Sequence, residues 1–465
     1  MLNKGLRSEK VTKTVLICHY RVGWTDGVSL EIEKRAQVLN DQGWEVFLLA
    51  GNNSEGADFV IDEMDFDNKD IRRITENSFN KLCDYTNEEV LLNHIYEYAN
   101  LIKNKIDAVL DKLNPDFILL HNIFSHGRHI ACAKAFYDVL KERKIPSLAT
   151  HHDFYWERDH LKQPTGKKIE NYLQKYVPPV LPGLRHAVIN SIAARKLLMK
   201  TGITTDIIPD TFNFDIPQWE KDDYNRELIT DFDLNEKDIF ILQATRIVKR
   251  KGIEIIPPII EKLNSQVYLN KLVGKTIYNG KKITSDSRFV FLLAGYAEEE
   301  AQDYLNSIKH QFDSNNIPYC FLNSQISAER KVIEGKKRYS LFDTYPYSDL
   351  ISFPSQFEGW GNQFIEGVFA HKPILVFEYP VFKSDIKPCG YHYISLGDEV
   401  RINNQTGLVA LDPNKISDIC EEIVETLLSE KTIGKLDHNY KLAEKNNSQT
   451  YLSRLMKWSM EHYEE

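Results

Sequence analysis

The chain has 465 residues, of which 42% are hydrophobic and 27% are charged, and it contains no long polar or low-complexity tract. This length exceeds one ordinary hydrophobic core and favours two domains of roughly 200 residues each. The net charge of −9 argues against nucleic acid as the main partner, because neutralising phosphates requires a basic face.

The sequence predicts neither a secretory signal nor a membrane span. Its N-terminal stretch MLNKGLRSEKVTK is basic but has no apolar core, so it does not resemble a secretory signal. No apolar run approaches the roughly 18 residues that a membrane span needs. The six cysteines are scattered, without a Cys-x-x-Cys pair, and several lie within apolar runs. We therefore expect a cytoplasmic protein with reduced thiols.

Short, continuous apolar runs recur along the chain between longer amphipathic stretches. Such runs predict strands buried on both faces, as in parallel sheets covered by helices. In the first half the predicted strands are 15–20, 45–51, 116–122, 146–152, 186–190 and 204–210. In the second half they are 238–246, 289–296, 317–323, 349–355, 372–378 and 407–411. The connecting segments are predicted to be helical; one begins at Asp26 and ends at Gly43.

The alternation of strand and helix in both halves predicts two doubly wound α/β domains. We expect an N-terminal domain over residues 1–208 and a C-terminal domain over 209–447. The remaining segment, 448–465, is predicted to form a helix that crosses back to the first domain or caps the second. In such sheets ligands bind beyond the carboxyl ends of the strands, so polar residues at those ends are the candidates for a site.

Two loops of the first half carry candidate site residues. Asp26 and Gly27 lead from the first strand into a helix whose free backbone N–H groups attract anions, although this motif taken alone favours a simple N-cap by Asp26 without a ligand. His152 and Asp153 end the strand 146–152 and favour a functional role, because burying titratable groups is costly unless they are paired. The histidines of HNIFSHGRH (121–129) lack the spacing of a zinc site, so we expect a polar lining and no metal.

The second half carries two charged motifs at strand ends. Arg246 and Lys251, in TRIVKRKG, suit a diphosphate beside a helix N-terminus, with a solvated basic turn as the alternative. Glu358 and Glu366 lie on either side of the glycine turn in FPSQFEGWGNQFIEGVF, and the helix is predicted to start near Asn362. The two carboxylates would then bracket an extended ligand with hydroxyls at both ends and negative charge between them, as in a nucleotide sugar. One continuous solvated helix is the alternative, which the two glycines disfavour.

In this order and at these strand ends, the motifs resemble those of retaining GT-B glycosyltransferases of family 4 (glycosyl transferases group 1) over nearly the whole chain. The most specific element is the Glu-x7-Glu pair of PSQFEGWGNQFIE. Supporting segments are YSDL, DGVSLE, HHDF, VINS, IIPDTFNFD, TRIVKRKG and NQTGLVALDP. The resemblance implies two Rossmann-like parallel-sheet domains that face each other across a cleft, the first for the acceptor and the second for the donor.

The resemblance also implies roles for residues of the second domain. Glu358 would bind hydroxyls of the donor sugar and Glu366 the ribose. Arg246 and Lys251 would hold the diphosphate and stabilise the leaving group. Backbone amides of the helix start would assist them, namely those of Gly361, Asn362 and Gln363. The sequence departs from the family here, since members usually carry a bulky apolar residue, and often a proline, after the second glycine.

In the first domain, the resemblance implies that Gly27 approaches the donor phosphates and that His152 reaches the donor sugar near the reacting carbon. Asp153 would order His152 or the acceptor. The remaining candidates lie on the acceptor side: Asp26, Ser29, His121 and Arg158.

The implied reaction is transfer of a hexose from UDP- or GDP-hexose to a hydroxyl of a sugar, small polyol or glycan, with retained configuration and no bound metal or other cofactor. A phosphorolytic or epimerising enzyme of the same fold is an alternative, and so is an inactive scaffold that binds sugar nucleotides. The nucleotide base, the hexose, the acceptor, the linkage, the oligomeric state and any peripheral contact with a membrane stay open.

Overall fold

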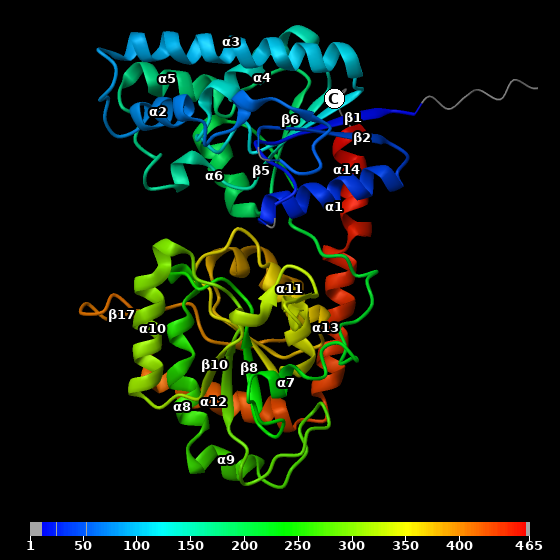
Figure 1. The fold of residues 1–465 in the computed structure, drawn as a ribbon, viewed down its shortest axis with the longest axis vertical. Helices are drawn as coiled ribbons and strands as arrows, with labels where there is room; N and C mark the ends of the chain where they lie inside the picture. The colour runs from blue at the N-terminus through cyan, green and yellow to red at the C-terminus, as the bar shows by residue number, and fades with distance from the viewer. Residues whose placement is uncertain (1–11, 25, 53, 462–465) are drawn as a thin grey trace, which may run out of the picture. The chain divides into compact units, whose positions relative to one another are not determined.

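The computed structural model describes residues 12–24, 26–52 and 54–461. The chain forms two compact units, each built around one parallel sheet (Figure 1). Unit 1 contains Met1–Thr211 together with Gln449–Glu465, and unit 2 contains Phe212–Ser448. No helix among the described residues is both long enough and apolar enough to cross a membrane.

Unit 1 contains a seven-stranded, all-parallel sheet with the order β3-β2-β1-β4-β5-β6-β7. Its strands are β1 (Thr14–Cys18), β2 (Glu45–Ala50), β3 (Phe59–Val60), β4 (Phe117–His121), β5 (Ser147–His151), β6 (Leu184–Val188) and β7 (Asp206–Ile207). The strand order reverses between β1 and β4. A doubly wound sheet binds its ligands beside such a reversal.

Helices cover both faces of this sheet (Figure 1). They are α1 (Gly27–Asp41), α2 (Lys69–Ser78), α3 (Glu88–Leu113), α4 (Ile130–Arg143), α5 (Lys167–Tyr176), α6 (Ser191–Thr201) and α14 (Gln449–Glu461). Side chains of β1 alternate between the two cores, because successive residues of a strand point to opposite faces. Leu16 and Cys18 pack with α2 to α5, whereas Val15 and Ile17 pack with α1 and α14.

Unit 2 contains a six-stranded parallel sheet with the order β10-β9-β8-β14-β15-β16. Its strands are β8 (Ile239–Gln243), β9 (Phe289–Leu293), β10 (Tyr319–Phe321), β14 (Leu350–Phe353), β15 (Ile374–Val376) and β16 (Ile394–Ser395). The helices are α7 (Leu228–Asp231), α8 (Pro257–Leu263), α9 (Gln266–Leu272), α10 (Gln302–Ser314), α11 (Asn362–Phe369), α12 (Pro413–Leu428) and α13 (Thr432–Asn447). Here the order reverses between β8 and β14. The prediction of two doubly wound parallel-sheet domains is confirmed.

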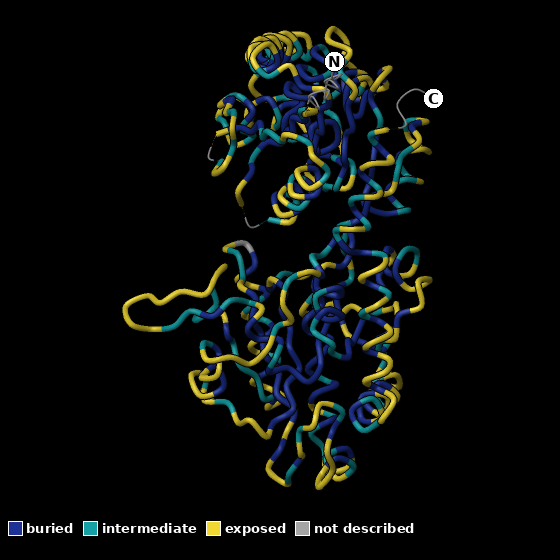
Figure 2. The backbone as a smooth tube through the Cα atoms, turned by 90° about the vertical axis from the view of Figure 1, so that its right-hand side faces the viewer, coloured by how far each residue is buried: buried dark blue, intermediate teal, exposed yellow. Residues whose placement is uncertain are grey.

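Burial explains why continuous apolar runs predicted these strands. Every residue of β4, β8 and β9 is buried, and Figure 2 shows exposed residues on helices and loops around buried strands. A strand covered on both faces needs apolar residues at every position rather than at alternate ones.

One predicted strand joins a different sheet. The run 407–411 contributes β18 (Val409–Ala410), which pairs antiparallel with β17 (Arg401–Ile402). The sixth strand of the main sheet is instead β16, which pairs with β15. The run does contain a strand, as predicted, but its place in the parallel sheet was wrong, because an apolar run indicates burial and not the strand with which it pairs. A small sheet of β11 (Ile326–Ser327), β12 (Lys331–Ile333) and β13 (Lys336–Ser340) was not predicted, since its residues are largely polar.

Candidate active site

A buried ion pair links the two loops that flank the strand reversal of unit 2. Lys251 follows β8 and Glu358 follows β14, and the Lys251 Nζ donates to Glu358 Oε1. The side chains are only 10% and 12% exposed. Arg250 Nη1 binds the other carboxylate oxygen, Oε2, at 2.7 Å, and the carbonyl of Phe357 at 3.0 Å. Glu358 therefore holds both cations at the carboxyl ends of β8 and β14.

The environment of this pair keeps Glu358 ionised. Burial acts to raise the pKa of Glu358, but the charges of Lys251 and Arg250 outweigh it, and the pKa lies below its usual value. Burial lowers the pKa of Lys251, the charge of Glu358 opposes this, and Arg250 and Arg246 add to the lowering. With two cations and one carboxylate, the group carries a net positive charge. Such a group suits a ligand that presents both hydroxyls and negative charge.

Arg246 also lies in the loop after β8, near enough to contribute to the pKa of Lys251. Its guanidinium forms an ion pair with Glu298 and is 46% exposed. The structure thus brings Arg246 and Lys251 into one loop, but it pairs them with different carboxylates.

The glycine turn leads directly into α11, as predicted. Gly361 is the N-cap and, having no side chain, makes no side-chain cap hydrogen bond. A Cβ atom at Gly361 would lie 2.6 Å from Tyr379 Oη, and this hydroxyl donates to the carbonyl of Trp360. Gln363 is buried, with its Nε2 3.4 Å from the carbonyl of Ser352 in β14. Its side chain therefore points into the fold, which leaves the backbone amide as its means of contacting a ligand.

Glu366 lies one turn into α11, also as predicted. Its Oε2 accepts a hydrogen bond of 2.6 Å from the hydroxyl of Tyr345. Tyr345 is fully buried, and burial raises the pKa of its hydroxyl, so it stays protonated and donates. This bond fixes one carboxylate oxygen of Glu366.

In unit 1, Asp26 caps α1. Its Oδ1 accepts from the backbone N–H groups of Val28 and Ser29 at 3.1 and 3.3 Å, and Ser29 Oγ donates to Oδ2 at 2.9 Å. The cap explains the position of Asp26 and Ser29 without a ligand. Gly27 is the first residue of the helix, and no atom lies within 4 Å of a Cβ placed there. The space beside Gly27 is open.

His152 and His121 form a stacked pair at the ends of β5 and β4. His152 Nε2 lies 3.2 Å from His121 Nδ1, and the ring centroids are 5.5 Å apart. The backbone N–H of His152 donates to Asn122 Oδ1 at 2.8 Å. Burial and the charge of Arg35 hold the pKa of His152 well below its usual value. His152 is therefore a neutral imidazole, and His121 is entirely buried beneath it.

Asp153 and Arg158 form an ion pair within the segment after β5, with side chains 30% and 29% exposed. Asp153 Oδ1 has no hydrogen-bond partner among the described residues. Within the same described ranges, no group of three or more His, Cys, Asp or Glu side chains is placed to hold a metal ion.

Comparison with known proteins identifies the class of enzyme. No protein-family model matches the chain. The chain is 36% identical over 420 residues to the mannosylglucosylglycerate synthase of Petrotoga mobilis, covering 90% of this chain and 94% of that protein. It is 33% identical over 441 residues to the protein of the same name from Thermotoga maritima, covering 93% and 96%. The chain belongs to the glycosyltransferase family of these two synthases. Its predicted activity class, a glycosyltransferase of the group 1 type, is confirmed.

The fold comparison agrees. A glycosyltransferase from Rickettsia africae superimposes with a TM-score of 0.61 at 15% identity, over 97% of this chain and 99% of that one. At this identity the likeness concerns the fold alone, and it confirms the predicted GT-B architecture. The roles of individual site residues stay predictions.

Three residues that matter to the site geometry were not predicted. Arg250 binds Glu358, Tyr345 binds Glu366, and Arg35 is a fully buried cation on α1 whose Nη1 donates to Thr150 Oγ1 at 3.0 Å. Arg250 was visible as part of the basic run VKRKG. The other two leave no signal in the sequence, because their partners become neighbours only on folding.

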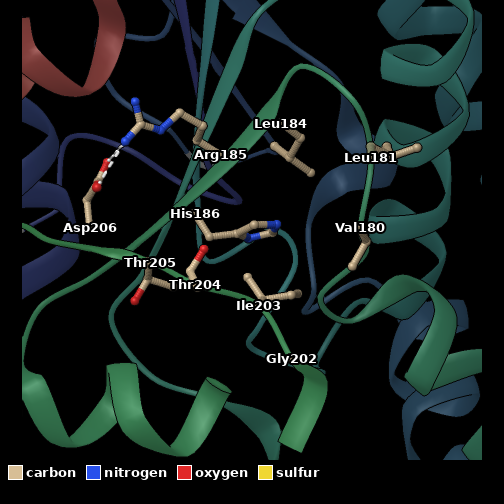
Figure 3. A pocket seen from close by; sticks show the side chains of 10 residues that line it. All are labelled: Val180, Leu181, Leu184, Arg185, His186, Gly202, Ile203, Thr204, Thr205 and Asp206. Atoms are coloured by element: carbon tan, nitrogen blue, oxygen red, sulfur yellow. Dashed lines mark hydrogen bonds and ion pairs between the residues drawn. The ribbon is translucent and has the colours of Figure 1, made fainter. Parts of the chain in front are cut away.

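A hollow elsewhere on unit 1 is not part of the candidate site. It has a volume of about 370 Å³ and is lined at one end by an Arg185–Asp206 pair with an Nη2–Oδ2 distance of 2.8 Å (Figure 3). Two of the lining residues, Leu184 and Asp206, are the first residues of β6 and β7. The hollow therefore lies toward the amino ends of the strands, away from the edge where such sheets bind ligands.

Proposed function

We propose that this enzyme transfers a mannosyl group from a nucleotide-diphosphate mannose to a hydroxyl of glucosylglycerate, with retained configuration, as a member of glycosyltransferase family 4. The observation that carries the proposal is the likeness to two mannosylglucosylglycerate synthases over 90% or more of the chain. Their name states the product, and we infer from it that mannose is joined to a preformed glucosylglycerate.

The donor is assigned to unit 2. Glu358 would accept hydrogen bonds from hydroxyls of the mannose, since the Lys251 and Arg250 charges keep it ionised. Glu366 would accept from the ribose, held in place by Tyr345. Between them, Lys251, Arg246 and the first amides of α11 would face the diphosphate. Negative charge grows on the diphosphate as the bond to the sugar breaks, and fixed positive groups stabilise it.

The acceptor is assigned to unit 1, together with Gly27, which would approach the diphosphate, and the neutral His152, which would hydrogen-bond a donor-sugar hydroxyl. Asp153 would order His152 or the acceptor. In the proposed front-face step, the acceptor oxygen bonds to the anomeric carbon on the side that the diphosphate leaves. The hydroxyl proton passes to an oxygen of the leaving diphosphate, which balances charge and atoms. Lys251 and Arg246 supply the positive charge, and no metal ion is assigned a step.

The test is turnover with chemically defined substrates. The protein is incubated with GDP-mannose or UDP-mannose and with glucosylglycerate. The mannosylated glucosylglycerate and the released nucleoside diphosphate are measured by mass spectrometry. We expect product with one of the two donors, and a loss of about 100-fold or more in Lys251→Met, because removing one preorganised charge-stabilising group has an effect of this order. Lys271→Met is the matched control, since Lys271 forms an exposed pair with Glu421 in the same unit.

Two results would contradict the proposal. Sugar release that depends on inorganic phosphate and needs no nucleotide would indicate phosphorolysis. Conversion of the nucleotide sugar without an acceptor would indicate epimerisation.

A further inference from the structure

Three arginines of unit 1 follow three neighbouring strands of its sheet. Arg21 follows β1, Arg128 follows β4 and Arg158 follows β5. Strands β1 and β4 flank the reversal of strand order, where a doubly wound sheet binds ligands. These side chains are only partly buried, so a ligand can reach them.

Arg21 and Arg128 contact the same aromatic ring. The Cζ atom of each lies 5.2 Å from the centroid of the Phe66 ring, and Arg21 also stacks on Trp24 at 4.5 Å. A guanidinium that packs its face on a ring keeps its edge N–H groups available for hydrogen bonds. Phe66 therefore contacts two cations, and the stacking leaves their N–H donors unused.

The turn that carries Arg128 packs closely on the segment that carries Arg158. The backbone N–H of Tyr155 donates to the carbonyl of Ser125 at 2.8 Å. Gly127 has a φ of +73°, and a Cβ atom there would collide with Tyr155. Burial lowers the pKa of Arg128 most, and the positive charge of Arg158 is the second-largest cause of the lowering. The two guanidinium groups thus lie within electrostatic reach of each other.

The charges of this group do not balance. Arg158 is paired with Asp153, and Arg21 Nε lies 3.6 Å from Asp26 Oδ2. For Arg128, no carboxylate lies within 4 Å in the described part of the chain, and Asp67 acts on it only from farther away. Within 4 Å, three arginines therefore meet only two carboxylates, and Asp67 opposes the third positive charge only at longer range.

A buried histidine beside Arg128 also has an unused ring nitrogen. His126 is 8% exposed, its ring centroid lies 6.2 Å from that of Phe66, and its Nδ1 has no hydrogen-bond partner within the described ranges. A buried polar atom without a partner is costly and in native structures is explained by a ligand or ordered water. An unpaired guanidinium and an unpartnered imidazole nitrogen here share one aromatic neighbour.

We propose that Arg128, together with Arg21 and His126, binds the carboxylate of the acceptor. The inference rests on the proposed function, in which the acceptor is glucosylglycerate, and it adds the group that selects an anionic acceptor over a neutral one. A guanidinium matches a carboxylate with two parallel hydrogen bonds. The surplus of one positive charge fits a monoanion better than the donor diphosphate, which is the other anion available to this enzyme.

The experiment is a calorimetric titration that needs no turnover. Glucosylglycerate and glucosylglycerol, in which an alcohol replaces the carboxylate, are titrated into the wild type, Arg128→Gln and Arg143→Gln. Arg143 lies at the opposite end of α4 from Arg128, is 36% exposed, and pairs with Asp107 and Asp111. GDP-mannose and UDP-mannose are titrated separately into the same three proteins.

We expect the wild type to bind glucosylglycerate about 10- to 100-fold more tightly than glucosylglycerol, as charge-assisted hydrogen bonds of 1.5–3 kcal/mol imply. Arg128→Gln should lose this preference, and Arg143→Gln should keep it. Equal binding of the two acceptors by the wild type would overturn the inference, as would a preference that survives in Arg128→Gln. Weaker donor binding in Arg128→Gln with the acceptor preference intact would reassign the group to the diphosphate. If the proposed function alone is wrong, mannosyl transfer fails while the carboxylate preference in binding persists.

Discussion

Replacing Glu358 by glutamine should destabilise unit 2 by about 3 kcal/mol, at the lower end of the cost of breaking a buried ion pair. Its side chain and that of Lys251 are 12% and 10% exposed, so the ammonium of Lys251 would stay buried without a compensating charge and beside a second cation, Arg250. Lys251→Met should cost less, about 1–2 kcal/mol, because Glu358 keeps its bond of 2.7 Å to the half-exposed Arg250.

The double variant separates these effects. With both Lys251→Met and Glu358→Gln, no charge is left buried and unpaired, so the total cost should be smaller than the sum of the single costs by about 1–3 kcal/mol. Lys271→Met and Glu421→Gln form the control cycle. That pair is 37% and 54% exposed, and its coupling should be no more than about 0.5 kcal/mol.

The assay is native-state hydrogen exchange, read by mass spectrometry on peptides covering β8 and β14. These strands are buried at the centre of the unit 2 sheet, so their slowest amides report the unfolding of that unit alone. If Glu358→Gln costs no more than Glu421→Gln and the two substitutions at the site add, then Glu358 is not the buried link between the two loops and the reasoning fails.

Substitutions at Gly27 and Glu366 and a change of pH test other parts of the structure. Gly27→Ala should leave the melting temperature of the free protein nearly unchanged, since its Cβ would meet no atom. It should weaken nucleotide-sugar binding at least 10-fold. Unchanged affinity in a calorimetric titration would refute a close approach of the donor to Gly27. Nucleotide sugar at 100 times its dissociation constant should stabilise the folded protein by about 2.7 kcal/mol and so raise its melting temperature. Glu366→Ala should abolish this rise, whereas Tyr345→Phe should only reduce it. Lowering the pH from 7 to 5.5 should destabilise unit 1 by several kcal/mol, about 1 kcal/mol for each buried imidazole whose pKa is depressed: His19, His121, His126, His129, His151, His152 and His186. Because burial lowers these folded-state pKa values, the unfolded chain binds more protons below about pH 6.5, and stability falls as pH falls. Hydrogen-exchange rates of the β4 amides, corrected for intrinsic exchange, should therefore rise between pH 7 and 5.5. Rates that do not rise would contradict this prediction.

The sequence predicted those features of the fold that depend on local pattern. Runs such as that around β9 are apolar at every position, and this identifies a strand buried on both faces wherever its partners lie. The start of α11 followed from Gly359 and Gly361, because two glycines in four residues oppose a helix through them. The position of Glu358 in the loop and of Glu366 one turn into the helix followed in turn.

Features that depend on pairing between distant segments were not predicted. Val409 lies in an apolar run like those of the main sheet, yet it pairs with Ile402 in a separate hairpin. Tyr345 and Glu366 are 21 residues apart, and nothing in either segment marks them as partners. Arg246 was expected to act with Lys251, but its pairing with Glu298 depends on a residue after β9. The cytoplasmic location and the roles of the individual site residues stay predictions.

The most direct test of the central claim is proton NMR of a single reaction, with GDP-mannose or UDP-mannose as donor and glucosylglycerate as acceptor. The proposal predicts that the anomeric signal of the donor decays while a new mannosyl signal with the same anomeric configuration grows, correlated to a carbon of the acceptor. A new signal of the opposite configuration would contradict retention. Donor decay without any signal linked to glucosylglycerate would contradict the proposed transfer itself.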